Sequence, residues 1–121
     1  MRVTKDDYLN KFAIDLSLEF RSENYDNETN ALNLWLANNE ENLVDYLAAI
    51  GMTEEHECWN EEEFTRALLE QDKHILRYGD VPLKGMRDEN NNFIPFVAPK
   101  ANRILRNAHM IRVGFSRYGG Y

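Results

Sequence analysis

The sequence contains one cysteine, Cys58, and no long apolar run. A single cysteine rules out a disulfide within the chain, which favours a reducing compartment. No stretch approaches the ~20 apolar residues that a membrane-spanning helix needs. The first ten residues, MRVTKDDYLN, have no apolar segment of the kind found in a signal peptide. We therefore expect a cytoplasmic protein that does not contact a membrane.

Signatures of catalysis and of cofactor binding are also scarce. The glycines do not form the phosphate-binding patterns GxxxxGK[ST] or GxGxxG. His56-Glu57-Cys58 is the only local group of metal-ligand types, whereas a structural zinc site needs about four such ligands. A nucleophilic role for Cys58 would require a histidine base placed by the fold, and His56 is too close in sequence to serve as one. We expect no metal, no cofactor and no enzymatic activity.

Acidic residues are absent from the last part of the chain. All 21 Asp and Glu lie between Asp6 and Glu89, so residues 1–89, with nine Lys and Arg, carry a net charge of −12. Residues 90–121 carry +5, and the whole chain carries −7. This asymmetry has two explanations: a partner attracted by one of the two parts, or a basic segment that folds back on the acidic one.

Length and composition fit one domain. A chain of 121 residues with 43% hydrophobic residues can bury a core of ordinary size. We expect a single domain over residues 1–121, with an acidic helical part in residues 1–79 and a mixed, basic part in residues 80–121.

Apolar spacing predicts three or four helices in residues 1–79. The segment TKDDYLNKFAIDLSLEF has one apolar face, with Thr4 and Asp7 as a weak capping box, and the polar run RSENYDN should end it. A second segment, ETNALNLWLANNEENLVDYLAAIG, has two apolar stripes. We expect Asn38 and Asn39 to separate them into two helices, because asparagine favours caps, and Gly51 to end the second. The stripes are Leu32, Trp35 and Leu36, and then Leu43, Leu47 and Ile50.

The segment WNEEEFTRALLEQDKHILRYGD predicts a further helix. Asn60 should cap it together with Glu63, and Gly79 should end it. Trp59 precedes the cap. It either staples the helix by packing onto its first turn or serves as an exposed anchor for a partner. The expected buried residues of this helix are Phe64, Ala67, Leu68, Ile75 and Tyr78.

The apolar period changes after Asp80. Two extended runs flank Asp88-Glu89-Asn90-Asn91-Asn92, which predicts a β-hairpin, and Pro95 favours an edge position for the second run. Pro99 can open a short helix in which Ile104, Leu105 and Ala108 face inward. The alternation in IRVGFSRYGGY predicts a strand near the end of the chain. The fold class is therefore α+β: three to four N-terminal helices, then a β-hairpin, a short helix and a C-terminal strand.

The segment Glu28–Glu40, ETNALNLWLANNE, resembles one in small uncharacterised proteins of bacteriophages and plasmids. Their pattern is E-T-x-x-x-x-L-W-[IL]-x-N-[DN]-E. This sequence departs from it in lacking the aromatic residue usual after Glu-Thr, since Asn30 stands there, and in continuing as Glu41-Asn42-Leu43 in place of Gly-Leu-Tyr. The resemblance covers about a tenth of the chain. It implies an accessory protein of a phage or mobile element, in the cytoplasm of an infected or host bacterium. The matching residues are Glu28, Thr29, Leu34, Trp35, Leu36, Asn38, Asn39 and Glu40.

In that setting, the acidic residues indicate a protein that binds and inhibits a host nucleic-acid-processing or defence protein, of an anti-restriction or anti-CRISPR type. Acidic side chains can occupy a basic groove that would otherwise hold phosphate. A second copy of the chain could also pair along a strand near the terminus. The expected partner-binding residues are Glu40, Glu41, Asp45, Glu54, Glu55, Glu57, Trp59, Glu61, Glu62 and Glu63.

The alternative is a small nucleic-acid-binding module that uses the basic, aromatic ending. Arginine and aromatic side chains together bind single strands through phosphate contacts and stacking. The net negative charge of the chain disfavours direct binding of nucleic acid at long range. The residues of this alternative site are Lys100, Arg103, Arg106, Arg112, Phe115, Arg117 and Tyr118.

Overall fold

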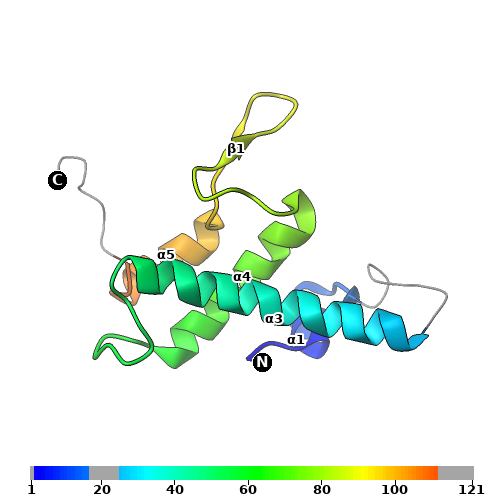
Figure 1. The fold of residues 1–121 in the computed structure, drawn as a ribbon, viewed down its shortest axis with the longest axis horizontal. Coiled ribbons are helices and arrows are strands. Elements are labelled where there is room, and N and C mark those ends of the chain that lie inside the picture. The colour runs from blue at the N-terminus through cyan, green and yellow to red at the C-terminus, as the bar shows by residue number, and fades with distance from the viewer. Residues whose placement is uncertain (1, 17–24, 112–121) are drawn as a thin grey trace.

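The computed structural model describes residues 2–16 and 25–111. In these residues the chain forms four helices and one two-stranded antiparallel hairpin, so the predicted helix-rich α+β class is confirmed (Figure 1). The predicted C-terminal strand falls almost entirely in residues 112–121, outside the described residues. In chain order the elements are α1 (Lys5–Phe12), α3 (Tyr25–Ala49), α4 (Glu61–Tyr78), β1 (Met86–Arg87), β2 (Phe93–Ile94) and α5 (Pro99–Asn107).

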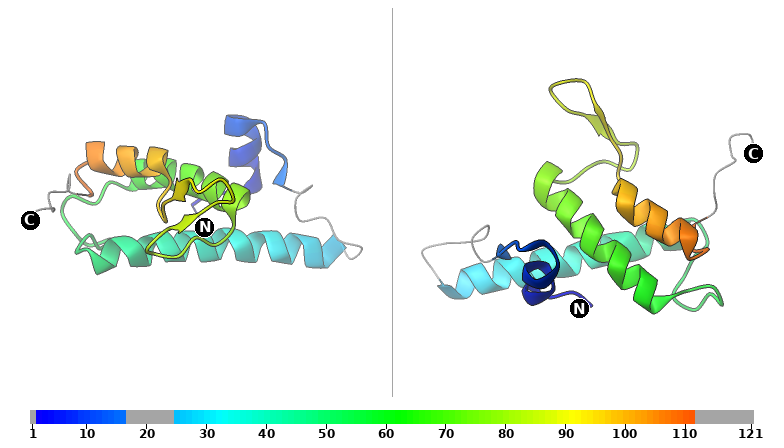
Figure 2. Two further views of the ribbon diagram at one scale, coloured as in Figure 1. Left: turned by 90° about the horizontal axis from the view of Figure 1, so that it is seen from above. Right: turned by 180° about the vertical axis from the view of Figure 1, so that it is seen from behind.

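The long helix α3 forms one layer of the molecule. Helices α1, α4 and α5 all lie on the same side of it, and α4 crosses it obliquely (Figure 2). Helix α5 packs mainly on α4, and the hairpin projects from the end where α4 stops and α5 begins (Figure 1). Within the described residues, no helix is both long enough and apolar enough to span a membrane.

Helix α1 is shorter than the sequence predicts. The capping box at its start is present, with the backbone N–H of Thr4 donating to Asp7 Oδ2 at 2.8 Å. However, the helix ends at Phe12 because Ala13 adopts a left-handed conformation with φ of 57°. Tyr8 is fully buried and its hydroxyl donates to the Leu69 carbonyl of α4 at 3.3 Å. Helix α1 is thereby anchored to the middle of α4.

The predicted break at Asn38 and Asn39 is wrong, because α3 is continuous from Tyr25 to Ala49. Its start also lies within RSENYDN, the run expected to be non-helical. Asn39 is only 4% exposed and sits in the same buried stripe as the leucines before and after it. This stripe recurs every three or four residues along α3, so packing against the rest of the core outweighs the capping preference of asparagine. The stripe consists of Leu32, Leu36, Asn39, Leu43 and Leu47.

The end of α3 also differs from the prediction, at one residue. Ile50, expected in the buried stripe, follows the last helical residue and is 52% exposed. Gly51 then has a positive φ of 93°, and the Met52 N–H donates a hydrogen bond to the Leu47 carbonyl oxygen at 2.8 Å. The predicted glycine stop of this helix is therefore confirmed, at the point where the chain leaves α3 for the loop to α4.

Helix α4 begins and ends at the predicted residues, but the Glu63 carboxylate, expected to complete the cap, pairs with Arg66. The Asn60 side chain accepts the Glu63 N–H at 3.1 Å, and Gly79, with φ of 77°, ends the helix. Phe64, Ala67 and Leu68 are buried as expected. Ile75 and Tyr78 are only partly buried.

The hairpin has the predicted position, with Met86 opposite Ile94 and Arg87 opposite Phe93. Asp88 organises its turn, because Oδ1 accepts the N–H groups of Asn90 and Asn92 at 2.9 and 2.8 Å. These bonds, above all the one from Asn92, lower the pKa of the Asp88 carboxyl. The turn thus depends on side chain to backbone bonding, as its composition predicts.

The short helix α5 opens with Pro99 as predicted and buries Ala101 and Leu105 against α4, with Ile104 and Ala108 partly buried beside them. The link between the hairpin and α5 is held by Gln71 of α4. Its Nε2 donates to the Phe96 carbonyl at 2.8 Å, and its Oε1 accepts the Ala98 N–H at 2.7 Å. One buried cluster contains residues of α1, α3, α4 and α5.

Candidate functional site

The predicted acidic residues belong to three segments: the second half of α3, the loop before α4 and the first turn of α4. We call this region the acidic end. Residues 40–63 contain nine carboxylates and no Lys or Arg. The nine carboxylates are Glu40, Glu41, Asp45, Glu54, Glu55, Glu57, Glu61, Glu62 and Glu63.

Arg2 joins three of these carboxylates, one from each segment of the acidic end. Its backbone N–H and its Nη1 each donate to the Glu40 carboxylate at 2.8 Å. The same guanidinium pairs with Glu54 in the loop and with Glu61 at the start of α4. The bond to Glu61 raises the pKa of Arg2 and lowers that of Glu61. Arg2 therefore fixes the relative positions of α3, the loop and α4, and neutralises one of the nine charges.

Trp59 performs the stapling role predicted for it. It is the residue before the cap, and its ring lies 4.7 Å from the ring of Phe64 in the first turn of α4. Its Nε1 donates to Glu61 Oε1 at 3.0 Å. The indole is half-buried, so packing on Phe64 accounts for its position. Its role as a partner anchor stays a prediction.

The remaining carboxylates of the acidic end are largely free for contact. Glu63 pairs with Arg66, one turn later on α4. The other five are exposed and have no ion pair within residues 2–16 and 25–111. They are Glu41, Asp45, Glu55, Glu57 and Glu62.

Only part of the alternative basic site can be placed. Lys100, Arg103 and Arg106 are exposed on α5 at the predicted spacing of one turn. The others lie outside the described residues: Arg112, Phe115, Arg117 and Tyr118. What the sequence did not reveal is that Lys100 shares a pocket with two cations of α4.

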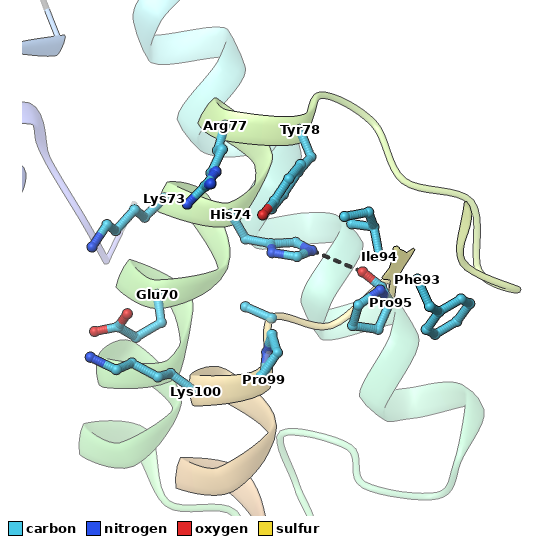
Figure 3. Close-up of a pocket in the computed structure, with 11 residues that line it drawn as sticks. Glu70, Lys73, His74, Arg77, Tyr78, Phe93, Ile94, Pro95, Pro99 and Lys100 are labelled. Atoms are coloured by element: carbon cyan, nitrogen blue, oxygen red, sulfur yellow. Dashed lines mark hydrogen bonds between the residues drawn. The ribbon is translucent and has the colours of Figure 1, made fainter. Parts of the chain in front are cut away.

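This pocket lies between the second half of α4, the segment Phe93–Pro95 and the start of α5 (Figure 3). We call it the α4–α5 pocket. Its volume is about 320 Å³. Lys73 and Arg77 line it from α4 and Lys100 lines it from α5. In Figure 3 Lys73 and Lys100 extend to the left, with Glu70 between them, and Arg77 points down from the top of the view. The spacing of Lys73 and Arg77 marks them as helical neighbours, but no local pattern links them to Lys100, which lies 23 residues beyond Arg77 in the sequence.

His74 forms part of the pocket wall and links α4 to the segment that follows the hairpin. The side chain is buried, and Nε2 lies 2.8 Å from the Pro95 carbonyl oxygen. A carbonyl oxygen only accepts, so Nε2 must carry the hydrogen, and Nδ1 is the acceptor when the ring is neutral. Tyr78 stands edge-on to His74, with ring centroids 5.0 Å apart.

The potential metal ligands His56, Glu57 and Cys58 lie in the exposed loop before α4. His56 Nδ1 accepts the Cys58 N–H at 2.9 Å and so stabilises the turn. Among the described residues, no group of three or more His, Cys, Asp or Glu is arranged to hold a metal ion.

Comparisons of the chain with protein-family models, with curated proteins and with solved structures find no match. The resemblance of residues 28–40 to phage and plasmid proteins therefore stays a prediction from the sequence.

Proposed function

We propose that this protein is a non-catalytic binding protein whose acidic end docks on a basic surface of another protein. The observation that carries the proposal is the convergence of carboxylates from α3, the loop and α4 around Arg2, in a region with no Lys or Arg of its own between residues 40 and 63. The phage or plasmid setting makes the partner a nucleic-acid-processing or defence enzyme in the cytoplasm of a bacterial host. That setting rests on the resemblance of residues 28–40.

The physical basis of inhibition is competition with phosphate. A basic groove binds nucleic acid chiefly through contacts to phosphate, and an acidic protein surface gains the same Coulomb attraction. Arg2 supports this role because it holds Glu40, Glu54 and Glu61 in place before binding, which lowers the entropy lost on docking. The contact charge comes from the five exposed carboxylates that have no ion pair within the described part of the chain.

The first experiment is capture of partners by the tagged protein from nuclease-treated bacterial lysate, followed by mass spectrometry. A captured protein is then purified and tested for direct binding and for loss of its nucleic-acid binding. Charge complementarity predicts that Glu57→Lys weakens the complex at least about tenfold. The matched control is Glu89→Lys, which makes the same charge change at an exposed site in the hairpin turn and should leave affinity within about twofold.

The same experiment separates the alternative function. A nucleic-acid-binding module would bind DNA or RNA directly, with affinity that falls steeply as salt rises. It would lose that binding on Arg103→Glu and Arg106→Glu and keep it on Glu57→Lys. Direct nucleic-acid binding with this pattern, or equal effects of Glu57→Lys and Glu89→Lys on the protein complex, would contradict the proposed acidic interface.

A further inference from the structure

The α4–α5 pocket takes no part in the proposed acidic interface, and none of its lining residues belongs to the acidic end. At about 320 Å³ it reaches the lower end of the range for small-molecule sites, which is roughly 300–1,000 Å³. Its walls come from two helices and from the strand segment that His74 ties to α4. The pocket therefore needs an explanation of its own.

Positive charge predominates around this pocket although the protein as a whole is acidic. Among the described residues, Lys73, Arg77 and Lys100 line it, against one lining carboxylate, Glu70. The Glu70 side chain is only 9% exposed, and it pairs with Lys11 of α1 at 3.5 Å. The carboxylate is thus offset by a cation from outside the pocket. The three lining cations have no ion pair within the described residues. Lys73 Nζ lies 4.5 Å from the centroid of the Phe12 ring of α1, and the Arg77 guanidinium carbon lies 5.1 Å from that of Tyr78. These ring contacts do not neutralise the charges, so an anionic ligand would still be attracted to them.

The start of α5 adds to this positive potential. The cap residue, Ala98, has no side-chain oxygen for the first N–H groups of the helix, and the first turn contains no acid. Lys100 stands there instead, which is the opposite of the charge usually found at a helix start. An anion in the pocket would supply the missing acceptor.

The other walls are flat and apolar. Tyr78, Pro95 and Pro99 present rings to the pocket beside the His74 edge (Figure 3). The rest of the apolar lining consists of Phe93, Ile94 and Ala98. Such walls favour a ligand with a flat body next to its charged group, since stacking and apolar contact add to the attraction of the cations.

We propose that the α4–α5 pocket binds a phosphate ester with a flat ring system, of the class of a nucleoside monophosphate. The phosphate lies against Lys73, Arg77, Lys100 and the start of α5, and the base lies along Tyr78 and the prolines. This site is separate from the acidic end and does not depend on the docking function proposed for it.

The test is a titration of the whole protein with AMP, followed by two-dimensional NMR and calorimetry. Adenosine, ribose phosphate and inorganic phosphate are titrated in parallel. We expect AMP to bind at least about tenfold more tightly than any of the three, with shifts at His74, Tyr78 and Lys100. A dinucleotide with a 5′-phosphate shows whether the natural ligand is a free nucleotide or the end of a nucleic-acid strand. Tighter binding than AMP indicates a strand end, and equal or weaker binding indicates a free nucleotide.

Lys100→Gln and Arg103→Gln are matched variants, because both remove one exposed cation from α5 but only Lys100 lines the pocket. Lys100→Gln should weaken AMP binding by about fivefold or more, and Arg103→Gln by less than about twofold. Arg77→Lys keeps the charge and should retain most of the affinity, whereas Arg77→Gln should not. The proposal is overturned by equal effects of Lys100→Gln and Arg103→Gln, by equal binding of AMP and adenosine, or by AMP shifts outside the pocket.

Discussion

The guanidinium carbon of Arg2 lies 4.8 Å from the centroid of the Phe64 ring, so one cation covers the first turn of α4 while it pairs with three carboxylates. It lies 6.0 Å from the Trp59 ring as well. A cation over aromatic faces gains attraction from their electrons. Arg2 therefore combines charge neutralisation with packing at the point where three segments meet.

Arg2→Met should lower the free energy of unfolding by about 2 kcal/mol, because methionine keeps the apolar contact with Phe64 but removes the charge-assisted hydrogen bonds. Glu40, Glu54 and Glu61 would then repel one another. The loss should shrink in ~1 M salt, where charges are screened within ~3 Å. Urea unfolding at low and high salt measures both effects.

Arg66→Met is the control for this variant. It removes one cation that pairs with Glu63 on the same helix, across an exposed i, i+3 contact. Such pairs contribute about 0.2–0.5 kcal/mol. Equal destabilisation by the two substitutions would mean that Arg2 acts as an ordinary surface charge and not as the link between segments.

The local signals in the sequence predicted most helix ends and the hairpin. The residues that begin or end helices act at short range, on groups within a few residues of themselves, so their roles follow from the adjacent sequence. They are Thr4 with Asp7, Gly51, Asn60, Gly79 and Pro99. The same reasoning failed at Asn39. Its position in α3 is decided by packing against other elements, which outweighs a local preference.

The site features show the same division. The acidic residues and the stapling role of Trp59 could be predicted from the sequence, because each depends on residues that are close together along the chain. The contacts of Arg2 with Glu40, Glu54 and Glu61 span 38 to 59 residues, and no local pattern contains them. Lys73 and Lys100 likewise line one pocket because Gln71 and His74 hold the segment after the hairpin on α4.

Gln71 offers a direct test of that attachment. Gln71→Leu would leave the buried Ala98 N–H and the Phe96 carbonyl without their partner, at a cost of about 1–3 kcal/mol for each group. We expect a loss of roughly 3 kcal/mol in the free energy of unfolding. Hydrogen exchange of the Ala98 amide should become faster by a larger factor than exchange in the middle of α3.

Gln71→Glu is the matched variant. A glutamate can still accept the Ala98 N–H, but when ionised it has no hydrogen to donate to the Phe96 carbonyl. This variant should be destabilised at neutral pH and should recover as acid protonates the carboxyl. A pH-independent loss would contradict the assigned bond to Phe96.

Gly85→Ala should destabilise the hairpin by two separate effects. Gly85 has a positive φ of 83°, which costs a residue with a Cβ on the order of 1 kcal/mol. A Cβ there would also overlap the Phe93 ring and lie 3.0 Å from the Ile94 carbonyl oxygen. Gly51 has a similar φ of 93° but open space around it, so Gly51→Ala measures the backbone effect alone. We expect the larger loss in thermal unfolding from Gly85→Ala, and equal losses would show that Phe93 moves aside without cost.

Asp72 should make the stability of the protein depend on pH. Its side chain lies on α4, is fully buried, and neither carboxyl oxygen has a hydrogen-bond partner in the described part of the chain. Burial raises the pKa of Asp72 to about 8. Between the pKa of the unfolded carboxyl, ~3.9, and that of the folded one, the folded state holds a proton that the unfolded state has released. Stability should therefore fall as pH rises from about 5 to 8, by at most ~1.4 kcal/mol per pH unit from this group.

Asp72→Asn removes this dependence, because the amide resembles the protonated acid and cannot ionise. The variant should be more stable than the original protein at pH 8, by an amount that shrinks steadily toward pH 5, as measured by urea unfolding at several pH values. Asp45→Asn, at an exposed position on α3, should leave the slope unchanged. If the original protein and Asp72→Asn instead share one slope from pH 5 to 8, the carboxyl has found a partner or water that stabilises its charge. Its burial would then not govern the pH response, since a stabilised charge binds no extra proton on folding.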